Sequence, residues 1–302
     1  MYRPQGVLSS MVTSFDDKGR LDEAGIRRNV EFQVKAGIKS IVMLGGTGEP
    51  LSMTPEERKR TMEVSIEAAA GRLKVVIGTL VGNPTEVARD IENAAKAGAD
   101  ACMVTTTPFV RPHERDVQRF LTELASNSPI PLIVFNVPSR SGFLMSAKLV
   151  CDLARTVEKI VAIKESSRDI ALFSDIRAGT NASFSMLQGS DALFLPSLAL
   201  GGNGGILAAA AVFPEFCITI ERAVATGDLQ TARARHYELM ELVHLMYEAS
   251  HPAPLKLAIE LRGIPAGRTR PPFYGLTEDH QARIKRCVEK LLRSEDLVAT
   301  QA

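Results

Sequence analysis

One lysine at the end of a β-branched run has the setting that amine chemistry requires. The segment 160–164 reads Ile-Val-Ala-Ile-Lys, and Glu165 follows it. Because side chains alternate along a strand, Lys164 points into a barrel mouth if Ile163 packs under the surrounding helices. Burial lowers the pKa of an ammonium and supplies the neutral amine that attacks a ketone to form a Schiff base. The alternative is a strand-end lysine that extends to solvent.

A glycine-rich turn follows another β-branched run. Residues 45–50 read Gly-Gly-Thr-Gly-Glu-Pro, and the three glycines allow backbone amides to converge on an anion, while Thr47 adds a hydroxyl donor. No Gly-Lys-Ser/Thr follows, and the glycine run at 201–205 completes no dinucleotide fingerprint. We therefore expect a carboxylate site here and no nucleotide or other cofactor. A plain glycine turn is the alternative.

A loop stiffened by proline carries the third candidate. The run 135–142 reads Phe-Asn-Val-Pro-Ser-Arg-Ser-Gly, in which Arg140 can offer a planar fork to a substrate carboxylate. Considered alone, Arg140 would be an ordinary surface arginine. A second such loop, Thr-Thr-Thr-Pro at 105–108, carries hydroxyls toward the same expected pocket.

The elements that must position these residues alternate regularly. Short β-branched runs and longer helical patterns succeed each other as far as residue 213, which is typical of βα units around a parallel sheet. The eight predicted strands span 6–13, 40–44, 75–78, 101–104, 132–136, 160–164, 185–188 and 204–207. Eight strands favour an α/β fold of the (β/α)8 TIM barrel type, at 1–213, over a doubly wound sheet. Helical patterns at 215–226, 228–249, 254–262 and 277–293 predict a C-terminal helical annex at 214–302.

Composition limits the classes of partner. The 302 residues include 36 Lys and Arg and 35 Asp and Glu, so a net charge of +1 gives no electrostatic argument for nucleic acid or an anionic membrane. No apolar run reaches membrane-spanning length. Four widely spaced cysteines suit reduced thiols, and the five histidines show no zinc-like spacing. We expect a cytoplasmic protein that acts on a small molecule and binds no metal.

Six segments together resemble the dihydrodipicolinate synthase and N-acetylneuraminate lyase family over nearly the whole chain. These segments are 45–50, 107–108, 136–142, 163–165, 201–206 and 252–256. The resemblance implies a barrel with a C-terminal helical annex, assembled as a homotetramer or dimer of dimers. It also implies that Lys164 forms the Schiff base with pyruvate or another 2-oxo acid.

The same resemblance assigns roles to the neighbouring residues. Thr47, with the amides of Gly46 and Thr47, would hold the carboxylate of the 2-oxo acid, and the Ile206 carbonyl would line the pocket. The Pro-Ser-Arg-Ser-Gly run is closest to the synthase branch, which implies that Arg140 receives a second carboxylate at the entrance.

Three positions depart from the synthase pattern. Phe135 stands where a catalytic tyrosine opens the fifth loop, Gly46 stands where a hydroxyl residue precedes Thr47, and the phenol lent by a neighbouring subunit falls at Phe109 or Val110. None of the four tyrosines falls on a predicted strand end; they are Tyr2, Tyr237, Tyr247 and Tyr274. The sequence therefore predicts that the proton relay of the synthase is absent.

Three functions remain open at this point. The first is a Schiff-base lyase or aldolase acting on a 2-oxo acid, with aldol addition, retro-aldol cleavage or dehydration of a 2-oxo-3-deoxy acid as its reaction. Dehydration needs the fewest of the lost groups, because β-elimination from the imine can use one base and water. The second is a binding or regulatory protein that has lost turnover. The third is a genuine 4-hydroxy-tetrahydrodipicolinate synthase with a rerouted proton relay.

Overall fold

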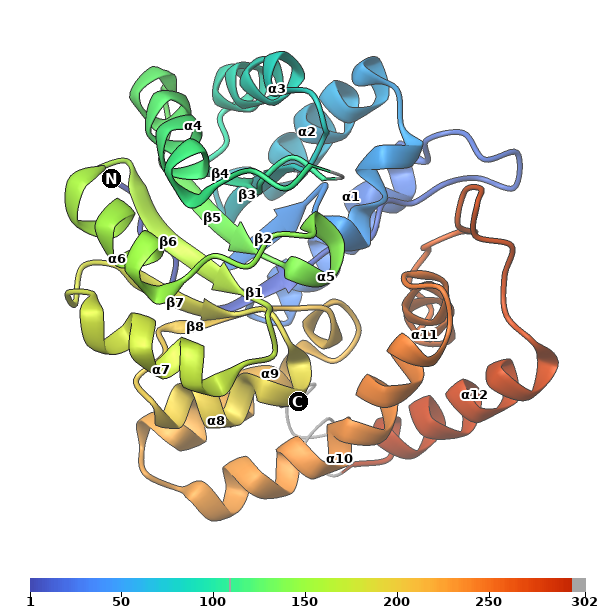
Figure 1. The fold of residues 1–302 in the computed structure, drawn as a ribbon. Coiled ribbons are helices and arrows are strands. Elements are labelled where there is room, and N and C mark those ends of the chain that lie inside the picture. Colours follow the sequence, from blue (N-terminus) through green and yellow to red (C-terminus); the bar gives the residue numbers. More distant parts are fainter. Residues whose placement is uncertain (109, 295–302) are drawn as a thin grey trace.

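Eight parallel strands close into a barrel in chain order, with β8 paired to β1 (Figure 1). The computed structural model describes residues 1–108 and 110–294. The strands are β1 (Gly6–Ser10), β2 (Ser40–Met43), β3 (Lys74–Thr79), β4 (Ala101–Val104), β5 (Leu132–Asn136), β6 (Ile160–Glu165), β7 (Ser185–Gln188) and β8 (Gly204–Leu207). The predicted (β/α)8 TIM barrel is confirmed.

Helices lie between successive strands and surround the barrel, and further helices follow β8 (Figure 1). The helices are α1 (Glu23–Lys35), α2 (Pro55–Ala69), α3 (Pro84–Ala97), α4 (Glu114–Asn127), α5 (Pro138–Ser141), α6 (Ala147–Thr156), α7 (Ile170–Gly179), α8 (Phe194–Ala199), α9 (Pro214–Ala225), α10 (Leu229–Glu248), α11 (Ala253–Leu261) and α12 (Glu278–Leu292). The described residues also form four short 3-10 helices: η1 (Gly46–Gly48), η2 (Pro50–Ser52), η3 (Asp191–Leu193) and η4 (Ala209–Ala211). The sequence determines where α2 begins, because Thr54 and Glu57 form a reciprocal capping box at its first turn.

The first strand is shorter than predicted. It was expected to run to residue 13 but ends at Ser10, although the amide of Met11 still donates to Val42. After Ser10 the chain runs beside the glycine-rich turn, where the Thr13 hydroxyl donates a hydrogen bond to the Gly48 carbonyl over 2.7 Å. In this segment a side-chain hydrogen bond to a loop replaces the strand-to-strand backbone hydrogen bonds. The apolar pattern of the sequence does not reveal this change.

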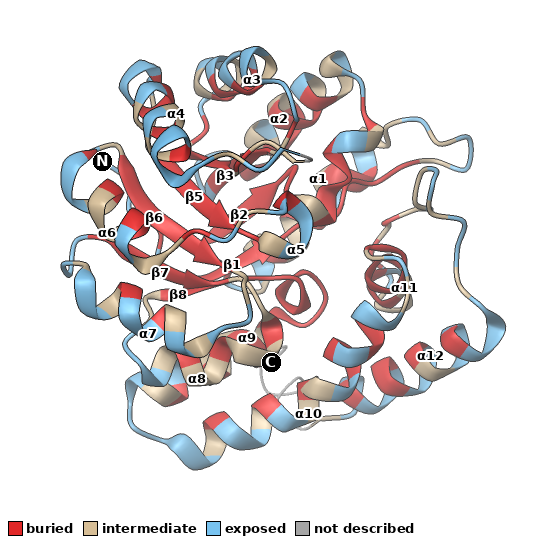
Figure 2. Ribbon diagram, in the orientation of Figure 1, coloured by how far each residue is buried: buried red, intermediate tan, exposed pale blue. Residues whose placement is uncertain are grey.

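Two apolar layers flank the strands, one inside the barrel and one under the helices. The inner layer includes Leu8, Met103 and Ala162, whereas Ile163 belongs to the outer layer. A register shift between β5 and β6 pairs residue 132 with 160 but 133 with 162, and this shift sets the phase of β6. Figure 2 shows the strands buried and the outer helices exposed on one side. With Ile163 outside, Lys164 faces the barrel interior, as alternation predicts.

The helices after β8 match their predicted positions within one residue at each end. Helix α10 packs against α9, α11 and α12, and it also contacts η3, at the barrel mouth (Figure 1). Helix α9 packs on β1 as well as on α10, so it belongs to the layer around the barrel and also touches the annex. The boundary between domains at 213 and 214 stays a prediction, and the end of the predicted annex, 295–302, lies outside the described residues. Among the described residues, no helix has the length and apolar character to cross a bilayer.

Candidate active site

A cavity of about 270 Å³ opens at the carboxyl ends of the strands, where TIM barrels place their reactive groups. Its walls come from the glycine-rich turn, the loops after β5, β6 and β7, and the end of α10. The lining residues are Gly46, Thr47, Phe135, Val137, Ser139, Arg140, Lys164, Ser166, Ser167, Arg168, Gly189, Ser190, Tyr247 and His251. Segments about 200 residues apart in the sequence, Gly46 and Tyr247 for example, therefore meet in one site.

Lys164 is the buried cation of this cavity. Only 7% of it is exposed, and its Nζ lies 4.4 Å from the centre of the Phe135 ring. Within residues 1–108 and 110–294, no carboxylate forms an ion pair with it. Burial lowers the pKa of Lys164 to about 8; the Asp191 carboxylate acts in the opposite direction and the Arg140 guanidinium in the same one. The solvent-extended alternative is thus wrong, and a useful fraction of the amine is neutral near neutral pH.

The strand end that carries Lys164 is fixed by its neighbour. Glu165 is buried, and its Oε2 accepts a hydrogen bond from Asn136 Nδ2 at the end of β5 over 2.6 Å. Asn136 Oδ1 in turn accepts from the amide of Met145 over 3.1 Å. Burial raises the pKa of Glu165, although hydrogen bonds from Ser167 and Asn136 act in the opposite direction. The carboxyl and amide therefore hold the ends of β5 and β6 in register, and with them Lys164 and Phe135.

The glycine-rich turn presents Thr47 at the centre of a hydrogen-bonded chain. The Ser10 hydroxyl donates to Thr47 Oγ1 over 3.1 Å, and Thr47 Oγ1 lies 3.1 Å from His251 Nε2. The amides of Gly46 and Thr47 open a short 3-10 helix, and the first amides of such a helix have no partner within it. The turn therefore offers amide donors and a hydroxyl at one side of the cavity.

The glycine at position 46 makes room for the cation at the entrance. A Cβ built on Gly46 would collide with Nη1 of Arg140, so a side chain there would displace the guanidinium. Arg140 lies in α5 and is exposed, and its guanidinium forms no hydrogen bond or ion pair with the described residues. A planar guanidinium that is free of protein carboxylates can bind the carboxylate of a ligand. The glycine at 46 is thus coupled to the position of Arg140.

Three further residues, which sequence reasoning missed, complete the site. Asp191 is 5% exposed, and its carboxylate accepts from the Ala209 amide over 2.8 Å and from the Tyr247 hydroxyl over 3.1 Å. The Tyr247 ring stacks on His251 with centroids 5.0 Å apart and planes 16° apart. Tyr247 lies on no strand end, as predicted, but α10 brings it to the mouth from outside the barrel.

Burial shifts the titration of all three of these groups. It raises the pKa of Asp191, against the opposing effect of the two donors and of Lys164. Burial also raises the pKa of Tyr247 well above its ordinary value, reinforced by the Asp191 charge. It lowers the pKa of His251 to about 4, so the imidazole that contacts Thr47 is neutral. Asp191 could have been found from its place three residues past a strand end, whereas no local signal places Tyr247 or His251 here.

The other predicted site residues are placed as follows. Gly46, Thr47, Phe135 and Arg140 line the same cavity as Lys164. Ile206 does not line it, since its side chain lies in the inner apolar layer of the barrel. The role of its carbonyl stays a prediction. Of the two positions considered for a neighbour's phenol, residue 109 lies outside the described residues, and Val110 is half exposed.

A buried ion pair joins the glycine-rich turn to the annex. Glu49, at the end of the turn, contacts Lys256 of α11, with Oε1 and Nζ 2.7 Å apart. The second oxygen of Glu49 accepts from the amide of Arg270 over 3.0 Å, while the Arg270 guanidinium pairs with Glu57 over 2.6 Å. Glu49 adopts a left-handed conformation, with φ of 56°. The annex therefore fastens the turn as well as supplying Tyr247 and His251.

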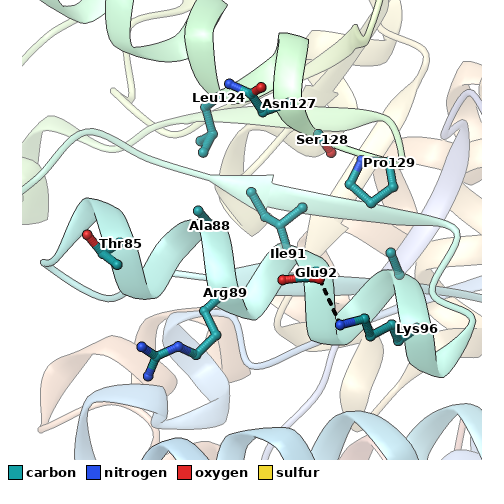
Figure 3. A pocket seen from close by; sticks show the side chains of 11 residues that line it. Thr85, Ala88, Arg89, Ile91, Glu92, Lys96, Leu124, Asn127, Ser128 and Pro129 are labelled. Atoms are coloured by element: carbon teal, nitrogen blue, oxygen red, sulfur yellow. Dashed lines mark hydrogen bonds and ion pairs between the residues drawn. The ribbon is translucent and has the colours of Figure 1, made fainter.

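A more voluminous cavity, about 800 Å³, lies elsewhere, between α3 and α4 (Figure 3). Its polar side chains belong to the outer surface; Lys96, for example, pairs with Glu92 on its own helix over 2.7 Å. None of the predicted site residues lines it. We therefore place the chemistry at the barrel mouth, where a buried amine and buried polar groups converge.

Several known proteins resemble this chain over most of its length. A sequence model of the Dihydrodipicolinate synthetase family matches residues 3–291. A 4-hydroxy-tetrahydrodipicolinate synthase from Methanothrix thermoacetophila is 35% identical over 292 residues, 96% of this chain and 97% of the relative. The crystal structure of dihydrodipicolinate synthase from Aquifex aeolicus has a TM-score of 0.91 and 31% identity, covering 95% of this chain and 98% of that one.

A third relative extends the likeness over almost the entire chain. The structure of the 4-hydroxy-tetrahydrodipicolinate synthase from Methylacidiphilum fumariolicum SolV has a TM-score of 0.93 and 26% identity, covering 99% of each chain. The barrel and these matches agree. The chain belongs to the dihydrodipicolinate synthetase family and is a lyase of the class I aldolase type, which works through a Schiff base on pyruvate or a related 2-oxo acid.

Proposed function

We propose that Lys164 is the amine that forms this Schiff base. The observation that carries the proposal is the burial of Lys164 without an ion-pair partner in the described chain, inside a cavity that also holds Thr47 and Arg140. The neutral amine adds to the keto carbon, and loss of water leaves the imine. The imine nitrogen withdraws electrons, so the bond beside it can be made or broken.

The carboxylate of the 2-oxo acid binds to the glycine-rich turn. The amides of Gly46 and Thr47 and the Thr47 hydroxyl provide neutral donors at one side of the cavity, and the Phe135 ring lies against Lys164. We assign the Ile206 carbonyl to the floor of the site, as the family resemblance implies. Arg140 at the entrance binds a second carboxylate, so the reaction partner is itself an acid.

The reaction that these features favour is aldol addition of pyruvate to a small aldehyde that carries a carboxylate, or its reverse. The curated relatives are 4-hydroxy-tetrahydrodipicolinate synthases, which supports a synthase reaction for this chain. Dehydration of a 2-oxo-3-deoxy acid is the second candidate. It is favoured by Phe135, because a site without a phenol on β5 has lost one of the groups that aldol addition uses.

We also propose that the protein acts in the cytoplasm as a homotetramer or dimer of dimers. The four cysteines are free thiols, and three of them are buried, which suits a reducing compartment. The assembly is proposed from the family resemblance. Light scattering after size exclusion gives the mass of the assembly, and a monomeric mass at micromolar concentration would contradict the proposal.

Trapping and turnover together test the proposed function. We expect borohydride to fix one pyruvate per chain, read by intact mass, and Lys164→Met to take up none. Turnover is then measured in both directions, with pyruvate plus glyoxylate, a semialdehyde or a sugar-acid aldehyde, and with 2-oxo-3-deoxy acids. Adduct formation without any turnover across this panel would support a binding protein instead. The absence of an adduct with every 2-oxo acid would overturn the proposal.

A further inference from the structure

The chemistry at Lys164 needs a proton carrier, and the phenyl ring of Phe135 cannot be one. We propose that Tyr247, paired with Asp191, carries the proton to and from the carbon next to the imine. The assignment rests on the proposed function of Lys164. It reverses the expectation, drawn from the sequence, that this site has lost its relay.

Tyr247 lies at the cavity and has a buried carboxylate beside it. Its hydroxyl lies 3.1 Å from Oδ2 of Asp191, and its ring lines the same cavity as Lys164 and Arg140. Because its own proton is directed to Asp191, the phenol oxygen keeps lone pairs that can accept a proton from a bound substrate. About 40% of Tyr247 is exposed, which leaves a route for exchange with solvent.

Asp191 is suited to accept the proton that the Tyr247 hydroxyl releases. It is almost fully buried and is held in place by the Ala209 amide over 2.8 Å. Burial raises the pKa of this carboxyl, so it takes up a proton more readily than an exposed aspartate. A negative charge at Asp191 also favours the cationic imine at Lys164.

His251 is a positioning residue for this pair. Its ring stacks under Tyr247 with centroids 5.0 Å apart, and its Nε2 lies 3.1 Å from Thr47 Oγ1. The stack fixes the plane of the phenol relative to the turn that binds the substrate carboxylate. One residue therefore links the orientation of Tyr247 to the orientation of the substrate.

The proposed step balances in atoms and charge. The imine of Lys164 with pyruvate carries a positive charge on nitrogen. The C3–H bond breaks, its proton goes to the Tyr247 oxygen, and the Tyr247 proton passes to Asp191 Oδ2. The C–H electron pair forms the C2=C3 bond, and the imine π electrons become the nitrogen lone pair, which gives a neutral enamine and a protonated Asp191. In the reverse direction the same two protons move back.

Ser166 is the competing carrier within the same cavity. Its hydroxyl oxygen is buried and has no hydrogen-bond partner among the described residues. A Cβ built on Gly189 would contact both this hydroxyl and the side chain of Lys164, so the two side chains approach one glycine. A serine hydroxyl without a base beside it is a weak proton acceptor, whereas Tyr247 has a carboxylate behind it.

Deuterium exchange into the methyl group of pyruvate tests the assignment, because it needs Lys164 and a proton carrier but no second substrate. The protein is incubated with pyruvate in D2O and the exchange rate is followed by NMR. We expect Tyr247→Phe to slow exchange about a hundredfold or more, while borohydride still traps pyruvate on Lys164. The matched control is Tyr237→Phe, a tyrosine on the same helix that is 72% exposed, and it should exchange at the wild-type rate.

Three further variants separate a chemical role from a structural one. Asp191→Asn should slow exchange as Tyr247→Phe does, and the double variant should be little slower than either single one, because the pair acts as a unit. His251→Phe keeps a ring beneath Tyr247 but loses the bond to Thr47, so KM for pyruvate should rise more than kcat falls. Ser166→Ala should change the exchange rate less than about threefold.

Three outcomes would decide against the assignment. If Tyr247→Phe forms the adduct and still exchanges within a factor of about three of the wild type, Tyr247 is not the carrier and the proposed function stands. A large loss in Ser166→Ala would transfer the role to that hydroxyl. If the wild type itself forms no adduct, the proposed function fails and this assignment fails with it.

Discussion

Two buried lysines of this protein share a residue type and an aromatic neighbour but differ in their partners. Lys164 Nζ lies 4.4 Å from the Phe135 ring centre, and Lys256 Nζ lies 4.5 Å from that of Phe15. Lys256 has a carboxylate at 2.7 Å and a backbone carbonyl at 3.0 Å, whereas Lys164 has no ion pair within the described residues. Both are almost fully buried.

The comparison teaches that the absence of a partner, and not burial alone, prepares an amine for covalent chemistry. Burial lowers the pKa of Lys256 as well, but the Glu49 carboxylate opposes that shift, and the ion pair holds the turn to the annex. Burial destabilises an ammonium at Lys164, because only more distant charges act on it. The two regions therefore divide the work: one lysine fixes the site and the other reacts in it.

The largest expected effect is on activity. Lys164→Met should reduce any turnover of a 2-oxo acid by roughly a thousandfold or more, because no other amine lines the cavity close to Thr47. The control is Lys74→Met, a strand lysine at the exposed start of β3, which should retain wild-type rates. Residual turnover within tenfold of wild type in Lys164→Met would contradict the claim that Lys164 is the reactive lysine of the two.

Stability should change in opposite directions at the two lysines. Lys256→Met leaves the Glu49 carboxylate buried without its cation, so we expect the free energy of unfolding to fall by about 3 kcal/mol at pH 7. Lys164→Met removes an uncompensated buried cation, and we expect the free energy of unfolding to rise by roughly 1–3 kcal/mol. Urea unfolding of the two variants and the wild type measures both changes.

The pH dependence of that stability gain follows from the sign of the shift. The pKa of Lys164 is lowered from 10.5 to about 8 in the folded protein, so the folded state is penalised most fully below about pH 8. Above pH 10.5 the amine is neutral in both states and the penalty vanishes. A gain in Lys164→Met that persists unchanged to pH 10.5 would show that packing, not charge, causes it.

The rate of imine formation should follow the same titration. We expect the initial trapping rate with pyruvate to rise with pH up to about 8 and then to level off, since only the neutral amine attacks. Arg140→Ala removes a cation that lowers the pKa of Lys164, so the midpoint should move to higher pH. A midpoint near that of a free lysine in the wild type would contradict the burial argument.

The smallest expected effect concerns the ring beneath Lys164. Phe135→Tyr should change turnover by less than about tenfold if Tyr247 already carries the proton. Steady-state rates on the best substrate of the panel measure this. A gain of a hundredfold or more in Phe135→Tyr would show that the site lacks a working carrier, as a protein that has lost turnover would.

Much of the fold and part of the site follow from the sequence, for identifiable reasons. The strand periodicity places Ile163 outside and Lys164 inside, and the glycine spacing at 45–48 predicts a turn whose amides face the mouth. These signals are local, because each depends on neighbouring residues only. Tyr247 and His251 reach the site through the packing of α10 against the barrel end, which is a tertiary effect. A single sequence carries no mark of that contact, so the predicted absence of a relay was drawn without it.

The partner of a buried lysine is equally hard to predict. Glu49 and Lys256 are far apart in the sequence and meet only because α11 packs beside the glycine-rich turn, and Glu49 needs a left-handed backbone to reach it. Nothing local distinguishes Lys256 from Lys164 as a candidate nucleophile except its place on a helix. The structure supplies the distinction by showing which of the two has a carboxylate.

The most direct measurement is the location of the trapped adduct. Wild-type protein is incubated with pyruvate and borohydride at pH 8, digested, and analysed by peptide mass spectrometry that resolves the peptides of the two lysines. The account predicts that Lys164 carries the reduced pyruvate and that Lys256 stays unmodified. Modification of Lys256, or of neither lysine, would contradict the claim that the unpartnered amine is the reactive one.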